Sequence, residues 1–69
     1  MLGDEIRKSR IKAGLTQEDL AFKAGISRNY VSLLELNERQ PTVKLLIRLC
    51  RAMGASASKI VARVESLPE

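Results

Sequence analysis

The sequence predicts an all-α fold of five short helices in one domain that spans residues 1–69. Three observations lead to this prediction. Apolar residues make up 45% of the chain and aromatic residues only 3%, so the core must be built from aliphatic side chains. Only two prolines occur, while Ala and Leu, which favour helices, are frequent. A chain of 69 residues is also too short to give each of two domains its own core.

The first helix is expected over residues 2–13, because a glycine follows at position 14. At helical spacing, four of its residues share one face. They are Leu2, Ile6, Arg10 and Ala13. The charge of Arg10 on this otherwise apolar face calls for a partner.

The next two helices are expected over residues 17–24 and 28–36, because residues suited to helix ends flank both segments. Thr16 and Ser27 have hydroxyl groups that can cap the backbone N–H groups of a helix start. Gly25 can end the first of these helices, since a residue without Cβ adopts the left-handed conformation at little cost.

Apolar side chains would hold these two helices together at a fixed angle. They are Leu20, Ala21, Ala24, Ile26, Val31 and Leu34. The small Ala21 allows a close approach, and Ile26 fills the corner of the turn. This spacing predicts a helix-turn-helix over residues 17–36, in which the second helix is offered to the major groove of DNA.

Glu35 carries a charge beside Val31 and Leu34, on the inward face of the second of these helices. Arg10 carries the opposite charge on the inward face of the first helix of the chain. We therefore expect a partly buried ion pair between Arg10 and Glu35; the alternative is that each side chain reaches water separately.

A fourth helix is expected to follow Thr42 and to end at Gly54, and a fifth to follow Ser56. The predicted inward positions of the fourth helix are Val43, Leu46, Cys50 and Met53. The apolar positions of the fifth are Ile60, Val61 and Val64. Residues 67–69 are expected to be a frayed tail.

Much of the chain resembles the Cro/repressor-type (Xre-like) helix-turn-helix regulators of bacteria and phages. The residues that carry the resemblance are Arg10, the run GLTQEDLA over 14–21, AGISRNYVS over 24–32, Glu35, Pro41-Thr42, and the stretch 46–60. The resemblance implies a lambda-repressor-like DNA-binding domain and a transcriptional regulator. It also implies that the helix over residues 28–36 is the recognition helix.

The outer face of this helix has side chains that suit base edges. The expected base-reading residues are Ser27, Arg28, Asn29, Ser32 and Leu33. Arg can bind guanine, Asn can bind adenine, and Leu can contact a thymine methyl group. The alternative is a solvated helix face. Leu36 lies far from the end that enters the groove, so protein contacts are an alternative for it, and the role of Phe22 stays open.

Contacts to phosphates should frame the recognition helix and set its register. The expected residues are Thr16, Gln17, Tyr30, Arg39, Gln40, Thr42 and Lys44. Thr16 and Gln17 begin one helix and Thr42 and Lys44 another, where free N–H groups attract anions. For Gln17, the resemblance also implies a phosphate contact.

Composition bears on the classes of function as well. The net charge of +4 and the pI near 9.7 are compatible with a nucleic-acid partner. Cys50 is the only cysteine and no histidine occurs, so we expect a reducing cytoplasm, no metal site and no cofactor. The sequence shows no catalytic constellation, signal peptide or membrane span, and we expect neither an enzyme nor a small-molecule ligand.

One domain of this size reads few base pairs, so we expect a homodimer on a near-palindromic site of double-stranded DNA. Four apolar residues on the last two helices are the expected dimer surface, with the alternative that some of them belong to the core: Leu45, Ile47, Val61 and Val64. The alternative function is a protein-interaction module, such as an antitoxin or scaffold, that keeps the fold with little DNA binding.

Overall fold

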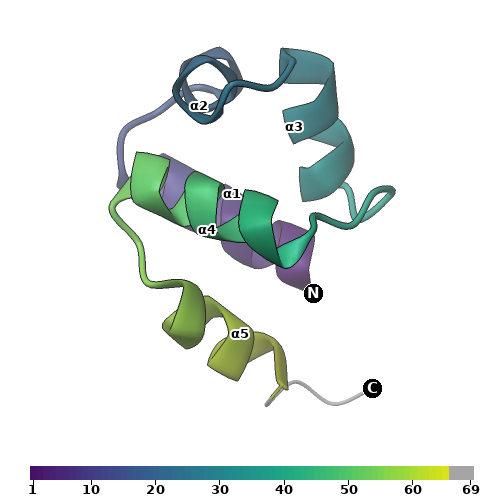
Figure 1. The fold of residues 1–69 in the computed structure, drawn as a ribbon, viewed down its shortest axis with the longest axis vertical. Helices are drawn as coiled ribbons and strands as arrows, with labels where there is room; N and C mark the ends of the chain where they lie inside the picture. The colour runs from purple at the N-terminus through teal and green to yellow at the C-terminus, as the bar shows by residue number, and fades with distance from the viewer. Residues whose placement is uncertain (66–69) are drawn as a thin grey trace.

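The computed structural model describes residues 1–65, which form five α-helices joined by short turns (Figure 1). The helices are α1 (Leu2–Lys12), α2 (Gln17–Ala24), α3 (Arg28–Glu35), α4 (Val43–Met53) and α5 (Ala57–Glu65). The predicted all-α, five-helix fold is confirmed. Ala13 and Leu36, expected as the last residues of α1 and α3, are instead the C-caps of these helices. The tail expected over residues 67–69 lies outside the described residues.

Side-chain hydroxyl groups cap the starts of four helices. The Oγ1 of Thr16 accepts the N–H of Asp19 at 3.0 Å, and Ser27 and Thr42 make the equivalent bond at the same distance. Ser56 accepts the N–H of Lys59 at 3.4 Å, at the start of α5. Each bond satisfies a backbone donor that has no partner within its own helix.

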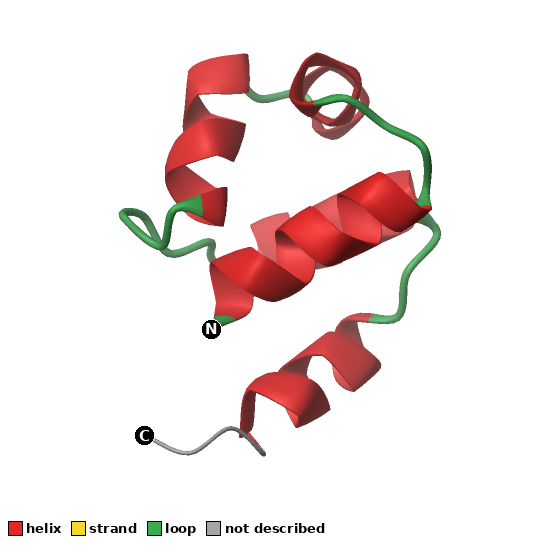
Figure 2. Ribbon diagram, turned by 180° about the vertical axis from the view of Figure 1, so that it is seen from behind, coloured by secondary structure: helices red, strands yellow, loops and turns green. Residues whose placement is uncertain are grey.

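The five helices form two layers and a closing element. Figures 1 and 2 show α2 and α3 together at one end, α1 and α4 crossing the middle on opposite sides, and α5 at the other end. α2 packs on α3 and α4, whereas α1 packs on both α3 and α5. The domain therefore presents α3 at one end of a body that the other helices hold in place.

The core is aliphatic, as the composition predicts. The most deeply buried large side chains are Ile6, Leu20, Val31, Leu34, Leu49 and Ile60. Each helix contributes at least one of them, so no helix can leave without exposing core surface. Burying an aliphatic side chain of this size stabilises the fold by about 1.5–3 kcal/mol.

The inward face predicted for α4 is partly wrong. Val43 was expected to point inward, but its side chain is 76% exposed. Leu45, expected on a dimer surface, is buried, and so is Leu49. The reason is that α4 packs against α2 on one side and α5 on the other, so it buries a wider arc than a single stripe.

The inward face predicted for α1 also needs a correction. Ala13 is exposed, because it follows the last turn of the helix. Glu5 takes a buried position that the sequence did not indicate, and its Oε1 lies 2.6 Å from the Nε of Arg63 on α5. This ion pair joins the first and last helices.

Within residues 1–65, no helix is both long enough and apolar enough to cross a membrane.

Candidate nucleic-acid interface

The turn between α2 and α3 fixes the angle at which α3 is presented. Gly25 has a φ of 72°, and its left-handed conformation ends α2. The N–H of Ile26 then bonds to the carbonyl oxygen of Ala21 at 3.0 Å, and the Ile26 side chain packs half-buried against the core. Because Ala21 is small and buried, α2 and α3 approach closely, as the sequence predicts.

α3 buries one face and exposes the other. Val31, Leu34 and Glu35 are buried. At the start of the helix, Ser27, Arg28 and Asn29 are exposed. The three residues expected to read bases at this end are therefore held together on the surface, on a helix whose opposite face is locked into the core.

The other residues expected to read bases are less accessible. Ser32 and Leu33 are half-buried, one turn farther along α3. Leu36 follows the helix and is exposed. The arrangement therefore gives the polar N-terminal end of α3 the most freedom to contact a partner, and Leu36 stays available for a contact of another kind.

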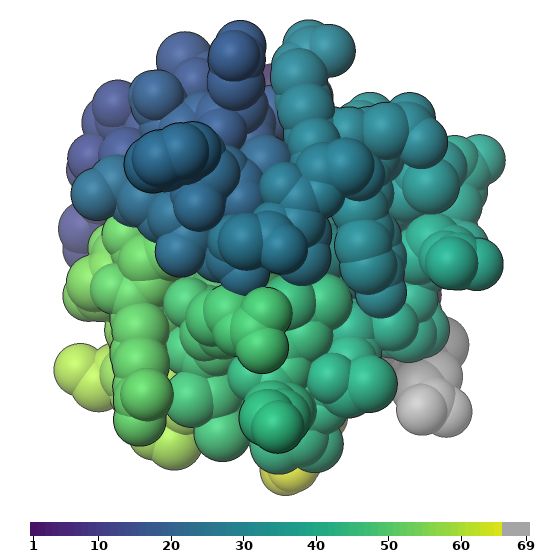
Figure 3. Space-filling model, turned by 45° about the horizontal axis from the view of Figure 1, so that its top comes forward, coloured from purple at the N-terminus to yellow at the C-terminus, as the bar shows by residue number. Residues whose placement is uncertain are grey.

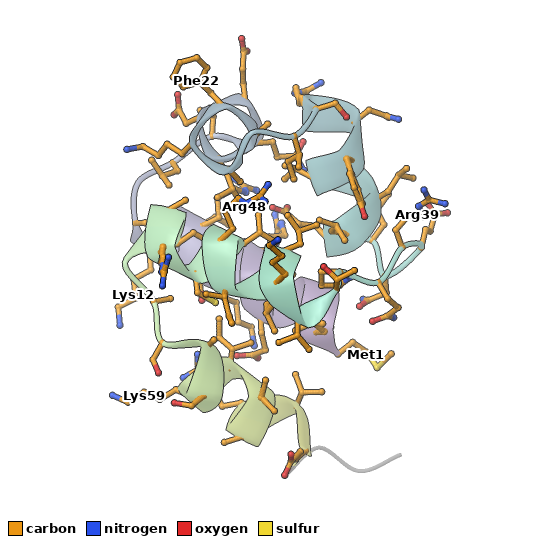
Figure 4. All side chains as sticks on the ribbon, viewed as in Figure 1. Met1, Lys12, Phe22, Arg39, Arg48 and Lys59 are labelled. Atoms are coloured by element: carbon orange, nitrogen blue, oxygen red, sulfur yellow. The ribbon has the colours of Figure 1, made fainter. Side chains whose placement is uncertain are left out.

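The loop after α3 brings two expected phosphate contacts together. The guanidinium carbon of Arg39 lies 5.8 Å from the centroid of the Tyr30 ring, which is within cation–π range. Figure 4 shows Arg39 on this loop, at the side of α3. Gln40 is also exposed. A basic group and a phenol therefore sit beside the exposed face of α3.

The start of α4 follows this loop directly. Thr42 caps the helix through a 3.0 Å bond from the N–H of Leu45 to its Oγ1. Thr42 and Lys44 are both exposed. The positive end of the helix dipole and the Lys44 ammonium group thus lie next to Arg39 in the sequence, which favours an anion at this position.

The start of α2 is less favourable to an anion than expected. Thr16 and Asp19 form a capping box, in which the carboxylate of Asp19 accepts the N–H of Thr16 at 2.9 Å. This backbone hydrogen bond, followed by the bond with the Thr16 side chain, holds the pKa of Asp19 below its ordinary value. Asp19 is therefore ionised at neutral pH, beside the predicted phosphate contact.

Gln17 lies half-buried and turns toward the protein. Its Nε2 donates to Oε1 of Glu35 at 3.2 Å. The same amide has a second N–H group, so the phosphate contact expected of Gln17 stays a prediction.

Beneath this surface, Arg10 and Glu35 form the ion pair that the sequence suggests. The Nε of Arg10 lies 2.6 Å from Oε2 of Glu35, and its second amino nitrogen lies 3.1 Å from Oε1. Arg10 also donates to the carbonyl oxygen of Leu15 at 2.9 Å. The side chains are 12% and 3% exposed, respectively. This bidentate pair joins α1 to the inward face of α3.

Sequence reasoning missed one support of the motif. A guanidinium nitrogen of Arg48, on α4, donates to the carbonyl oxygen of Ala24 at 3.2 Å (Figure 4). Ala24 is the last residue of α2, so the cation also faces the negative end of this helix dipole. Nothing in the sequence indicates this contact, because it joins residues 24 positions apart on different helices.

Figure 3 shows the face on which α2 and α3 lie side by side above α4. Phe22 belongs to the outer side of α2 and is 88% exposed, pointing away from the domain (Figure 4). The role of Phe22, which the sequence leaves open, is therefore not that of a side chain packed on the domain.

Comparisons with known proteins agree on the kind of domain. A family model described as helix-turn-helix matches residues 6–60. An uncharacterized HTH-type transcriptional regulator, y4dJ of Sinorhizobium fredii, is 35% identical over 68 residues, which cover 99% of this chain and 88% of that protein.

Two solved structures are similar over most of the chain. The clp gene regulator ClgR of C. glutamicum has a TM-score of 0.87 at 30% identity, with 99% of this chain and 91% of that chain covered. The biofilm master regulator SinR, solved in complex with DNA, has a TM-score of 0.82 at 27% identity, with 88% and 98% covered.

Proposed function

The chain belongs to the Cro/repressor-type (Xre-like) helix-turn-helix family, and we propose that it regulates transcription by binding double-stranded DNA with α3 in the major groove. The observation that carries this proposal is the exposed group Ser27, Arg28 and Asn29 at the start of α3. The first turn of the recognition helix is the part that goes deepest into the groove in this motif.

In this proposal, Arg28 and Asn29 read bases and Arg39 holds the backbone. Arg28 has the donors for the O6 and N7 atoms of guanine, and Asn29 suits the N6 and N7 atoms of adenine. Arg39 lies beside Tyr30, and both can reach phosphates on the flank of α3. Thr42 and Lys44 extend this flank along the start of α4, and Ser32 and Leu33 make secondary contacts farther along the groove.

We further propose that two copies bind together. A second copy doubles the number of base pairs read, and two-fold symmetry would place the recognition helices about 34–36 Å apart. α4 and α5 carry exposed apolar side chains suited to such a contact, namely Val43, Ile47 and Val61. Regulation of this kind involves no chemical reaction on a substrate, and it takes place in the compartment that holds the DNA, which we infer to be the cytoplasm.

Selection of random duplexes on the purified protein, followed by a salt titration, tests the proposal. Arg28→Ala should cost about 1–3 kcal/mol on the selected site and relax the preference at one base position. Arg39→Ala should weaken binding to all sequences alike and reduce the salt slope by about 0.9.

Lys59→Ala is the matched control, because it removes one positive charge from α5, at the end away from α3 (Figure 4). It should leave the base preference unchanged and affect affinity little. If the three variants lost affinity equally, or if Arg39→Ala alone changed the base preference, the assigned roles would be wrong.

A further inference from the structure

The start of α1 lies directly against the end of α3. The N–H of Gly3 donates to the side-chain Oδ1 of Asn37 at 2.8 Å, although 34 positions separate the two residues. Met1 occupies the N-cap position of α1, but within residues 1–65 it makes no side-chain capping bond. Asn37 therefore supplies from the far end of α3 the acceptor that the start of α1 would otherwise lack.

Only a glycine fits at the point of contact. A Cβ atom on Gly3 would overlap the carbonyl oxygens of Leu34 and Glu35, which belong to the last turn of α3. The start of α1 thus lies directly against the last carbonyl groups of α3, so that the positive end of one helix dipole lies close to the negative end of the other.

Asn37 also closes α3 through its own backbone. Its φ of 62° makes it the one residue other than glycine with a left-handed conformation within residues 1–65. The N–H of Asn37 bonds to Leu34 at 3.2 Å and that of Glu38 to Leu33 at 3.0 Å, which is the Schellman pattern. Glycine adopts this conformation at lower cost. Unlike a glycine, however, Asn37 has a side-chain oxygen that accepts the Gly3 N–H.

The Asn37 backbone begins the loop that carries Arg39. The N–H of Arg39 bonds back to the carbonyl oxygen of Leu33 at 3.3 Å, and its guanidinium group lies over the Tyr30 ring. The loop is thus folded onto α3 right after the residue that is tied to α1. Any shift of Asn37 would carry the Arg39 side chain with it.

We propose that Asn37 is a positioning residue for DNA binding, which ties the Arg39 loop and the end of α3 to the start of α1. The inference rests on the proposed function and assigns to Asn37 a role in phosphate contact that it performs through Arg39. A second tie between α1 and α3, the Arg10–Glu35 pair, lies seven residues farther along α1, or about 10 Å. The Arg10–Glu35 pair and the buried face hold α3 itself, so the tie through Asn37 acts mainly on the loop that follows the helix.

Asn37→Gly tests the inference, because it keeps the left-handed conformation and removes only the side-chain acceptor. Affinity for the selected duplex is measured for the wild type, Asn37→Gly, Arg39→Ala and the double variant, at a temperature where circular dichroism shows all four proteins folded. Asn37→Gly should weaken binding about three- to tenfold. The loss caused by Arg39→Ala should then be much smaller in the Asn37→Gly background than in the wild type.

Two controls separate positioning from a general loss of stability. The loss caused by Arg28→Ala should be the same with and without Asn37→Gly, since the start of α3 lies at the other end of the helix. Asn37→Asp keeps an acceptor oxygen, so the coupling to Arg39→Ala should persist and the Gly3 N–H should exchange with solvent more slowly than in Asn37→Gly.

The inference is overturned if folded Asn37→Gly protein binds the duplex as tightly as the wild type. It is also overturned if the fold-loss in affinity of the double variant equals the product of the fold-losses of Asn37→Gly and Arg39→Ala. Both results leave the proposed function in place as long as the wild type binds. If the wild type selects no duplex, the proposed function itself is wrong, and the inference is wrong with it.

Discussion

Replacing Arg10 with methionine would remove the cation of the buried pair while keeping a side chain of similar length. The carboxylate of Glu35, 3% exposed, would then lose two hydrogen bonds from the guanidinium group, at 2.6 and 3.1 Å. The 3.2 Å hydrogen bond from the side-chain amide of Gln17 would remain. The carbonyl oxygen of Leu15 would lose its donor as well.

The expected cost is large for a domain of this size. Breaking one side of a buried ion pair costs about 3–5 kcal/mol, because the remaining charge stays buried without compensation. A chain of 69 residues has a total stability of about 3–10 kcal/mol. At about 4–8 °C per kcal/mol, even a loss of 3 kcal/mol lowers the melting temperature by about 12–24 °C.

Thermal and urea unfolding followed by circular dichroism would measure this loss. Arg63→Met is the matched control, since Arg63 lies at the same 2.6 Å from Glu5 but is 54% exposed. Its removal leaves Glu5 with Lys8, 3.7 Å away. Because water reaches the Arg63 end of the pair and Lys8 still lies near the carboxylate of Glu5, the control should cost clearly less than Arg10→Met.

The combined variant Arg10→Met with Glu35→Met distinguishes two causes of the loss. One is the missing attraction between the two side chains, and the other is the cost of a buried carboxylate without a cation beside it. The combined variant should regain most of the stability lost in Arg10→Met, because no buried charge remains. The reasoning is refuted if Arg10→Met has the melting temperature of the wild type or if Arg63→Met lowers it by the same amount. It is also refuted if adding Glu35→Met to Arg10→Met restores no stability.

Three further predictions follow from single side chains. Because the pKa of Asp19 is lowered in the folded state, its carboxylate stabilises the fold fully above the ordinary value of 3.8, and this contribution is lost as the pH falls through the lower folded-state pKa. The unfolding free energies of the wild type and Asp19→Asn should therefore converge in an acid titration. A difference that stays constant with pH would contradict this prediction. Burial raises the pKa of the Cys50 thiol, so a disulfide reagent should label native protein only as fast as the protein unfolds; rapid labelling of folded protein would be the contrary result. Phe22→Ser should change the unfolding free energy by less than about 0.5 kcal/mol, and a melting temperature several degrees lower would mean that the ring packs on the domain.

Helix ends could be predicted from the sequence because their signals are local. Thr16, Ser27 and Thr42 each lie three positions before the N–H group that they accept, and Gly25 lies directly after the helix that it ends. The Arg10–Glu35 pair could be predicted for a different reason. Arg10 and Glu35 carry opposite charges on otherwise apolar faces, so each needs a partner inside the fold. The opposite charge on the other helix is a suitable one.

Features that depend on the packing of three helices could not be predicted in this way. The helical spacing predicts Val43 on the inward side and leaves the side of Leu45 open, because a stripe at this spacing does not tell how many neighbours the helix has. Glu5 was not expected to be buried, since its partner Arg63 lies 58 positions away. The contact of Gly3 with Asn37 likewise depends on where α1 begins relative to the end of α3.

For the candidate interface, the sequence indicated which element carries the exposed polar residues, and the structure adds their accessibility. Arg28 and Asn29 are exposed as expected, whereas Gln17 turns inward toward Glu35. A side-chain amide finds an acceptor wherever the fold brings one near, and the sequence does not show that Glu35 lies within its reach.

The contact between α1 and α5 has a consequence for how the chain reaches its native state during synthesis. Of the five helices, α1 is made first, yet α5, on which it packs, is made last. Ile60, on α5, is fully buried. When the nascent chain has left the exit tunnel only as far as the end of α4, this side chain is still missing. α1 then has an apolar surface that faces water. We therefore expect folding to complete only after most of α5 has left the exit tunnel, in one late step.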